Sequence, residues 1–218
     1  TLLIAVKLGL RPLAVHFDNG WNSEHAVSNI KNACKKLNVD LHTEVADWEE
    51  FKDLQKSFLE ASVPDAEVPT DWVIFSVLFR MAASMNIRYI IQGHSFRTEG
   101  TTPLSWTYMD GRYVKDIHRR FGTKKLKSFP VMTLPDYLYY TFARRIRQVR
   151  ILYYLPYNEQ QILELLENEL GWKNYGGKHH ESKYTGFFQS YILTRKFGID
   201  KRKLHYSALV RSGQLTRT

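Results

Sequence analysis

Short apolar runs alternate with amphipathic stretches along the first hundred residues of the chain. Three runs have the length and the polar ends of buried strands, at residues 11–17, 41–47 and 87–94. The segments around them carry apolar residues at helical spacing, which predicts helices over 1–8, 22–37, 49–61 and 71–86. Strands and helices that alternate in this way predict parallel strands with right-handed crossovers, and therefore an α/β sheet.

Particular residues indicate where these helices begin and end. Gly9 suits the C-terminal end of the first helix, and Asn22 suits the N-cap of the second. Two prolines mark residues 63–70 as a loop. Asp71 opens the apolar helix that follows, either as its N-cap or as a residue that contacts a ligand.

The pattern changes after Gly93. Residues 95–113 have no clear period and are predicted to form a long loop. The rest of the chain has mostly helical spacing, which predicts helices near 136–152, 158–171, 182–197 and 200–213. We therefore expect a change of domain near residue 100.

Charge is divided unevenly between these two regions. Residues 1–100 hold 10 Lys/Arg and 13 Asp/Glu, a net charge of −3, whereas residues 101–218 hold 21 and 9, a net charge of +12. This asymmetry indicates an anionic partner for the second region, such as nucleic acid, a membrane surface or a phosphorylated small molecule. A solvated basic face that binds nothing specific has the same composition.

The cysteine content indicates the cellular compartment, and the hydropathy bears on membrane insertion. Cys34 is the only cysteine, which excludes a disulfide within this chain and a CxxC metal site, so we expect a reducing cytoplasm. No apolar run has the length of a membrane-spanning helix, so membrane insertion is not expected.

Polar residues gather where the three predicted strands end. In an open parallel sheet, ligands bind beyond the carboxyl ends of the strands, so these ends form one candidate site. Each end taken singly also fits an ordinary turn. The third end offers a glycine for close backbone approach, donors for a phosphate, and an acid for a metal ion or a positive group: Gly93, His94, Ser95, Thr98 and Glu99.

Two basic clusters stand beside predicted helix starts in the second region. In the first, Gly176, Gly177 and Lys178 suit an anion at a helix N-terminus. A metal site there is the weaker interpretation, because adjacent histidines do not share a helix face. The residues of that weaker interpretation are His179, His180 and Glu181. The residues of the second cluster are Lys201, Arg202 and His205, of which the first and last share a face in a helix.

Residues 142–157 carry four arginines among aromatic side chains. This pattern fits an RNA-binding stripe or a helix on a membrane surface. Aromatic residues at this density are more often the core of a helical lobe.

Four segments closely resemble the N-acetyl sugar amidotransferases of lipopolysaccharide and O-antigen synthesis: "AVHFDNGWNSEHAVSNI", "PTDWVIFS", "IIQGHSFRTEG" and "GGKHHESKYTGFFQSYILTRKFGIDKRKLHYSALVRSGQLTR". That family belongs to the N-type ATP pyrophosphatases, or PP-loop enzymes. The resemblance implies a doubly wound parallel sheet of the adenine nucleotide alpha hydrolase type, followed by a mostly helical C-terminal region. Residues 1–100 would bind the nucleotide, and the basic residues 101–218 would bind the substrate. The family's SGGxDS phosphate loop is not in the sequence and is expected upstream of Thr1.

The resemblance also implies a reaction. ATP adenylates the acetamido oxygen of a sugar nucleotide and releases pyrophosphate, and ammonia then displaces AMP to leave an acetamidino group. Mg²⁺ would be held largely by ATP itself, so the protein is not expected to have a metal site of its own. Ammonia would come from a glutaminase with a barrel-type partner subunit.

Residue roles follow from the matched motifs. His16, Phe17, Asp18 and Asn19 would line the adenosine, while Trp21 would pack on the following helix or stack on the adenine. Around the α-phosphate we expect Gly93, His94, Ser95, Thr98 and Glu99. His94 and Asp71 are the candidate catalytic residues. The acceptor would contact Lys178, His179, His180, Glu181, Gln189, Lys201, Arg202 and His205.

Two other functions compete with this interpretation. A tRNA-thiolating relative has the same nucleotide fold, but those enzymes generally use paired cysteines and this chain has only Cys34. A basic nucleic-acid-binding module without catalysis fits the charge of the second region. It leaves the "QGHSFRTEG" motif unexplained, so nucleic acid is the less favoured partner.

Overall fold

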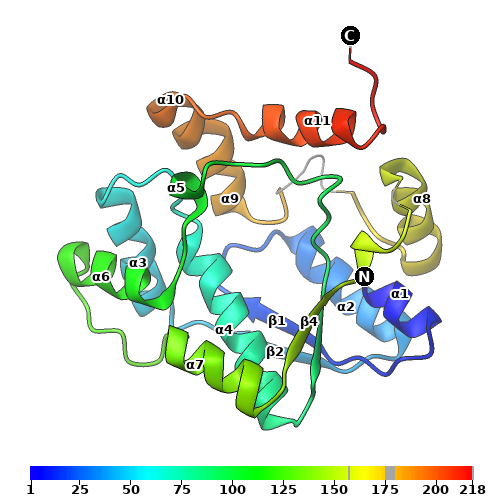
Figure 1. Ribbon diagram of the computed structural model, residues 1–218, viewed down its shortest axis with the longest axis horizontal. Coiled ribbons are helices and arrows are strands. Elements are labelled where there is room, and N and C mark those ends of the chain that lie inside the picture. The colour runs from blue at the N-terminus through cyan, green and yellow to red at the C-terminus, as the bar shows by residue number, and fades with distance from the viewer. Residues whose placement is uncertain (157, 175–179, 218) are drawn as a thin grey trace.

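The computed structural model describes residues 1–156, 158–174 and 180–217 (Figure 1). Its four strands form two parallel pairs. Strand β1 (Ala14–Asp18) pairs with β2 (Leu41–Val45), with Ala14 opposite Leu41. Strand β3 (Tyr89–Gln92) pairs with β4 (Arg147–Arg150), with Tyr89 opposite Arg147. The three strands expected from the sequence are therefore present, with shorter bounds, and β1 and β2 are parallel as predicted. That the two strand pairs belong to one doubly wound sheet remains a prediction.

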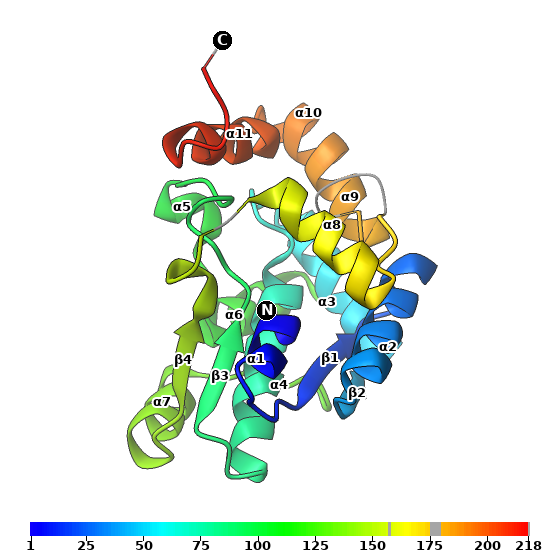
Figure 2. The same cartoon turned by 90° about the vertical axis from the view of Figure 1, so that its right-hand side faces the viewer.

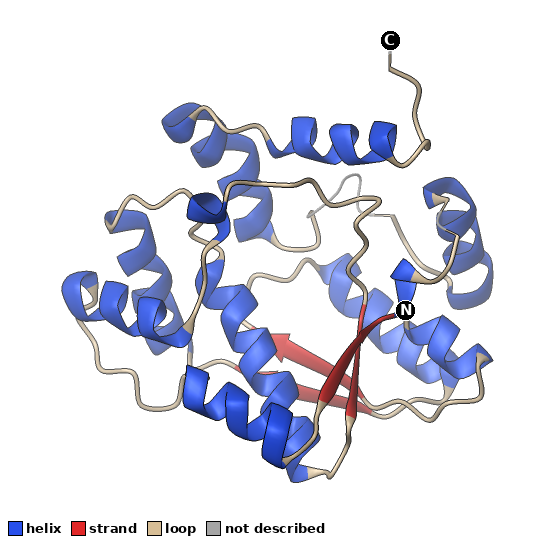
Figure 3. Ribbon diagram, in the orientation of Figure 1, coloured by secondary structure: helices blue, strands red, loops and turns tan. Residues whose placement is uncertain are grey.

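Helices surround the two pairs (Figure 3). Those of the first half are α1 (Leu2–Lys7), α2 (Glu24–Leu37), α3 (Trp48–Glu60) and α4 (Val68–Ser84). The middle of the chain forms α5 (Leu104–Thr107), α6 (Gly111–Phe121) and α7 (Leu134–Leu138), the last continued by a π turn at Tyr139–Ala143. A 3₁₀ turn at Ile151–Tyr153 follows β4. The last part forms α8 (Glu159–Leu170), α9 (Lys183–Phe187), a π turn (Phe188–Ile192), α10 (Leu193–Phe197) and α11 (Lys201–Arg211).

Helix α4 contacts both β1 and β3 and so connects the two strand pairs. On the β1 side, Val73 and Val77 pack with Phe17. On the β3 side, Phe79 and Ala82 pack with Ile90. Because the helix is covered on two sides, its sequence is apolar around most of its circumference.

The largest core cluster joins residues from both halves of the chain. Leu54 and Phe58 of α3 pack with Val114 of α6 and with Tyr184 and Phe188 near α9. These side chains are at most 9% exposed. Figure 2 shows α9, α10 and α11 together at one end of the molecule.

Several boundaries expected from the sequence are wrong. The helix predicted over residues 136–152 is shorter than expected, and the last part of that range forms β4 instead. Arg145 has a φ of +55°, which ends the helical path, and the residues after it pair with β3. Tertiary pairing outweighs helix propensity there. The predicted loop 95–113 contains α5 and the start of α6, whose N-cap Asp110 accepts a hydrogen bond from Tyr113 N.

Two helix starts also differ from expectation. Helix α4 begins at Val68 inside the predicted loop 63–70, since a proline in the first turn lacks only an N–H that would be unpaired anyway. Its N-cap is Glu67, so Asp71 lies in the first turn and is not the cap. The N-cap of α2 is Ser23, whose Oγ accepts from Ala26 N, and not Asn22.

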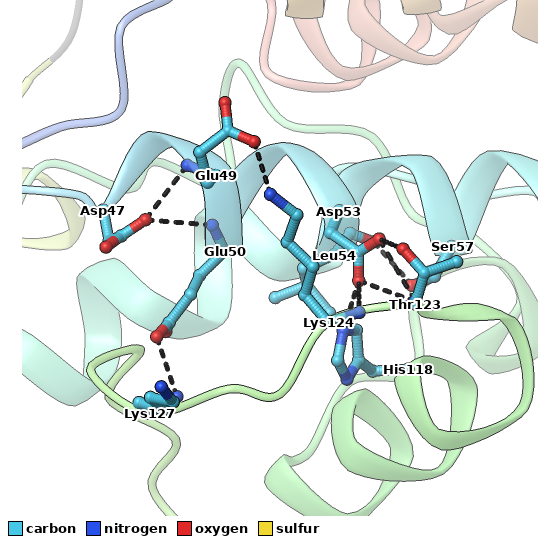
Figure 4. Close-up of polar contacts among 10 residues, drawn as sticks. All are labelled: Asp47, Glu49, Glu50, Asp53, Leu54, Ser57, His118, Thr123, Lys124 and Lys127. Carbon is cyan, nitrogen blue, oxygen red and sulfur yellow. Dashed lines mark hydrogen bonds and ion pairs between the residues drawn. The ribbon is translucent and has the colours of Figure 1, made fainter.

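Two buried carboxylates of α3 fasten the segment at residues 123–129 to the core (Figure 4). Glu50 accepts hydrogen bonds from the backbone N–H groups of Lys127, Ser128 and Phe129. Asp53 accepts from Thr123 Oγ1 and from the backbone N–H of Lys124, and it lies 2.8 Å from His118 Nε2. Burial alone raises the pKa of Asp53, but these hydrogen bonds outweigh it and hold the pKa far below its ordinary value.

We predict that Asp53→Ala lowers the free energy of unfolding by about 2–4 kcal/mol, because buried donors lose a charged acceptor. The folded-state pKa is depressed, so the stabilisation is complete above the unfolded value of 3.8 and is lost as the pH falls toward the folded value. Urea denaturation at pH 7 and at low pH measures both effects. Glu49→Ala, which removes an exposed ion pair with Lys124, is the control and should cost much less, because solvent screens exposed pairs. Equal losses in the two variants would contradict the prediction.

Candidate functional site

A cavity of about 2340 Å³ lies among β1, β3, helix α4 along most of its length, and helices α9 to α11. We call it the central cavity. Residues 14–17 of β1 and 89–92 of β3 both line it, so the strands approach one space from two sides. Its other lining residues include Thr70, Asp71 and Lys201.

Most of the residues predicted at the strand ends lie around this cavity. Asp18 and Ser95 are not among its lining residues. Asp18 Oδ1 instead accepts a hydrogen bond from Gly20 N, and the buried Ser95 accepts one from Arg97 N. The predicted residues that do line the cavity are His16, Phe17, Asn19, Asp71, Gly93, His94, Thr98 and Glu99.

The end of β1 turns sharply through two side-chain to backbone hydrogen bonds. Asp18 Oδ1 accepts from Gly20 N at 3.0 Å, and Asn19 Oδ1 accepts from Trp21 N at 3.1 Å. Gly20 has a φ of +80°, in the left-handed region that favours glycine. Burial lowers the pKa of His16, and the charge of Asp18 opposes this only partly. His16 therefore presents a neutral ring to the cavity at neutral pH.

Trp21 packs against other aromatic side chains and does not line the central cavity. Its ring contacts Trp48 at a centroid distance of 5.3 Å and Tyr184 at 5.5 Å. Its Nε1 donates a hydrogen bond to Gln55 Oε1 at 2.6 Å. Of the two roles considered from the sequence, the structure shows packing, with ring contacts to Trp48 of α3 and Tyr184 of α9.

The end of β3 brings the chain close to Thr1. A Cβ on Gly93 would lie 2.9 Å from Thr1 Oγ1, so this approach suits a residue without a side chain. His94 Nδ1 lies 3.7 Å from Glu99 Oε2, and both side chains are substantially exposed. A group bound beside Gly93 would meet this pair.

Residues of the second half close the other side of the cavity. His205 Nδ1 lies 2.7 Å from Thr98 O, which ties α11 to the segment after β3. The guanidinium of Arg202 bonds both carboxylate oxygens of Asp200. The predicted acceptor residues that line the cavity are His180, Glu181, Gln189, Lys201, Arg202 and His205. Gly176, Gly177, Lys178 and His179 lie outside the described residues.

The sequence interpretation missed a buried acid at the cavity. Glu67 is 6% exposed and lines the cavity, and its Oε2 accepts a hydrogen bond from Thr185 Oγ1 at 2.6 Å. Burial is the main cause that raises its pKa to about 7; the charges of Asp71 and Asp65 add to this, while the Thr185 hydroxyl and Lys201 oppose it. Three acids around the start of an apolar helix, at positions 65, 67 and 71, were the available signal.

Neither a cluster of metal-binding side chains nor a membrane-spanning helix is found in the described part of the chain. There, no three His, Cys, Asp or Glu side chains gather closely enough to hold a metal ion. Among the same residues, every helix is too short or too polar to span a lipid bilayer.

Comparison with known proteins connects the end of the chain with surface polysaccharide chemistry. Residues 181–218 match the family model described as "LPS biosynthesis protein WbpG-like, C-terminal domain". That range contains α9 to α11 and the cavity residues Gln189, Lys201, Arg202 and His205. The match supports a role in lipopolysaccharide biosynthesis. A search of curated proteins gave no match.

We predict that Glu67→Gln removes a pH-dependent loss of stability. The pKa of Glu67 is raised from 4.5 to about 7 on folding, so its contribution is fully present below pH 4.5 and is lost as the pH rises through 7. Between pH 4.5 and 8 the wild type should lose about 3 kcal/mol more unfolding free energy than the variant. Urea denaturation across this range measures the difference. Glu60→Gln, at an exposed residue of α3, should follow the wild-type curve; parallel curves for all three proteins would contradict the prediction.

Proposed function

We propose that this chain is part of an ATP-dependent amidotransferase that converts the N-acetyl group of a sugar nucleotide to an acetamidino group in lipopolysaccharide synthesis. One observation carries the proposal. The segment that matches the lipopolysaccharide family model contributes Gln189, Lys201 and His205 to the same cavity that the ends of β1 and β3 line. An acceptor held by that segment would therefore face the strand ends, where nucleotides bind in parallel sheets.

The fold belongs to the same proposal. The two strand pairs are taken as parts of one doubly wound parallel sheet of the adenine nucleotide alpha hydrolase type. In its favour, both pairs are parallel, both pack on α4, and β1 and β3 border one cavity. A phosphate loop that precedes Thr1 would end beside Gly93, at the carboxyl end of β3.

The residues around the cavity fit the groups of ATP. Gly93 leaves room for backbone approach, and the side chains of His94 and Thr98 are donors for a phosphate. His16, Phe17 and Asn19 border the side assigned to the adenosine. ATP with Mg²⁺ would supply the α-phosphate that activates the acetamido oxygen, and the chain would hold the two reactants in line.

On the acceptor side, the cations of α11 would hold the diphosphate and the sugar. Lys201 lines the cavity, and charge–charge attraction there is stronger than in bulk water. Ammonia would be delivered by a glutaminase and a barrel-type partner subunit. We place the reaction in the cytoplasm, where ATP is available.

Cys34 weighs against the tRNA-thiolating alternative. It lies buried in α2, and burial raises the pKa of its thiol. A buried thiol with a raised pKa is a poor sulfur carrier.

We predict that the protein with its phosphate loop releases AMP and pyrophosphate. Release should need both an N-acetylated sugar nucleotide and a source of ammonia, because adenylation and amination share one intermediate. Coupled pyrophosphate assays and chromatography of the nucleotides measure this. ADP and inorganic phosphate as products would contradict the proposal, as would tight ATP binding by residues 1–218 without the loop in calorimetry.

We predict that Lys201→Ala raises the KM for the sugar nucleotide about 10- to 100-fold, because a charged contact to phosphate is lost. The KM for ATP should stay within about twofold. Lys203→Ala is the matched control, since Lys203 lies on the same helix, is exposed and does not line the cavity. A steep fall of RNA affinity with salt, together with no binding of any sugar nucleotide, would instead favour the thiolating enzyme.

A further inference from the structure

The acid at the start of α4 has an acceptor atom that the chain does not satisfy. Glu67 is 94% buried, and Thr185 donates to its Oε2. Its Oε1 is buried and accepts no hydrogen bond from any residue that the structure describes. An acceptor that is buried without a donor is destabilising, so a ligand that brings a donor would be stabilised here.

A second unsatisfied group belongs to the same neighbourhood. The hydroxyl of Tyr184 is buried and forms no hydrogen bond within the described residues. Burial raises the pKa of Tyr184, and the negative charges of Glu67 and Asp65 raise it further. Tyr184 therefore stays neutral, and it lies close enough to Glu67 for the carboxylate charge to act on it, although it does not line the central cavity.

The charges that act on Glu67 come from each element packed around it. Asp65 stands before α4, and Asp71 lies in the first turn of that helix. Lys201 of α11 is the opposing cation, while Tyr184 and Thr185 of α9 are neutral. Among the described residues whose charges act on Glu67, Asp65 and Asp71 add negative potential and Lys201 opposes it, and a negative potential at a buried carboxylate favours a small cation over an anion.

We propose that Glu67 binds ammonium at the central cavity and takes one proton from it, so that ammonia is released beside the acceptor. This assignment rests on the proposed amidotransferase function. The same carboxylate would favour a small N–H donor over a metal ion, because no cluster of metal ligands exists among the described residues.

The proton balance of the step is complete. Ammonium passes one proton to the Glu67 carboxylate and becomes ammonia. The ammonia nitrogen forms a bond to the carbon of the O-adenylated imidate, and the carbon–oxygen bond to AMP breaks with its electron pair on AMP. The three hydrogens of ammonia stay in the amidinium product, and Glu67 then returns its proton to solvent. A carboxyl with a pKa of about 7 accepts this proton more readily than an ordinary glutamate does.

Nuclear magnetic resonance of the ¹³C-labelled wild-type protein tests the binding step without any reaction. The Glu67 carboxyl resonance is titrated with pH in ammonium chloride, sodium chloride or tetramethylammonium chloride at equal ionic strength. Ammonium should lower the apparent pKa of Glu67, by about one unit at a concentration ten times its Kd, because it binds the ionised form. No shift, or an equal shift with sodium, would overturn the assignment. A shift produced only by a sugar nucleotide would overturn it too, because the carboxyl would then serve the acceptor.

Kinetics test the catalytic step. Glu67→Gln keeps the size of the side chain, and it should raise the KM for ammonia at least about tenfold while the KM for ATP stays within about twofold. Glu60→Gln, which neutralises an exposed acid of α3 that does not line the cavity, should behave as the wild type. An active enzyme whose KM for ammonia is unchanged in Glu67→Gln would refute the ammonium site. An ammonium-specific pKa shift in a protein without amidotransferase activity would retain the site and refute the proposed function.

Discussion

The packing of helix α4 between two parallel strand pairs is the constraint on which the site depends. Phe17 of β1 and Ile90 of β3 pack on different parts of the same helix, so its position fixes where both strands end. The helix also begins at the cavity, where Glu67 occupies the N-cap position and Asp71 follows in the first turn. One rigid element thus sets the distance between the acidic residues and the two strand ends. A change in its packing would move both sides of the site together.

Charged groups fix the second half of the chain onto this frame. Glu50 and Asp53 hold the segment after α6 through backbone N–H groups, which are donors that only a substitution to proline would remove. At the cavity, Thr185 bonds Glu67 and His205 contacts the backbone of Thr98. Burial of a carboxylate is costly unless donors satisfy it, so these acids specify where the later segments attach.

The sequence predicted the elements whose signal is local. The apolar runs before Asp18 and Gly93 gave β1 and β3, and the helical spacing of residues 158–171 gave α8. Strand β4 was missed because its four residues, two of them arginines, take their conformation from pairing with β3. The cavity residues of α11 were recognised by motif, whereas Glu67 was not. The acids at positions 65, 67 and 71 are a local signal, but they do not show that Glu67 is buried or that Thr185 of α9, more than a hundred residues later, bonds it.

The positive charge of the second half is not all available to an anionic partner, because several of its cations form ion pairs within the fold. Several of its cations are used within the fold: Arg202 bonds Asp200, Arg120 bonds Asp116, and Lys124 bonds Glu49. At the central cavity, the charge of Lys201 acts on Glu67 together with those of Asp65 and Asp71, so the lining there is not uniformly basic. A nucleic-acid groove needs a continuous run of phosphate contacts. A cavity that combines cations with a buried carboxyl suits a small ligand that carries phosphates at one end and a reacting nitrogen at the other, because each end then meets the charge it requires.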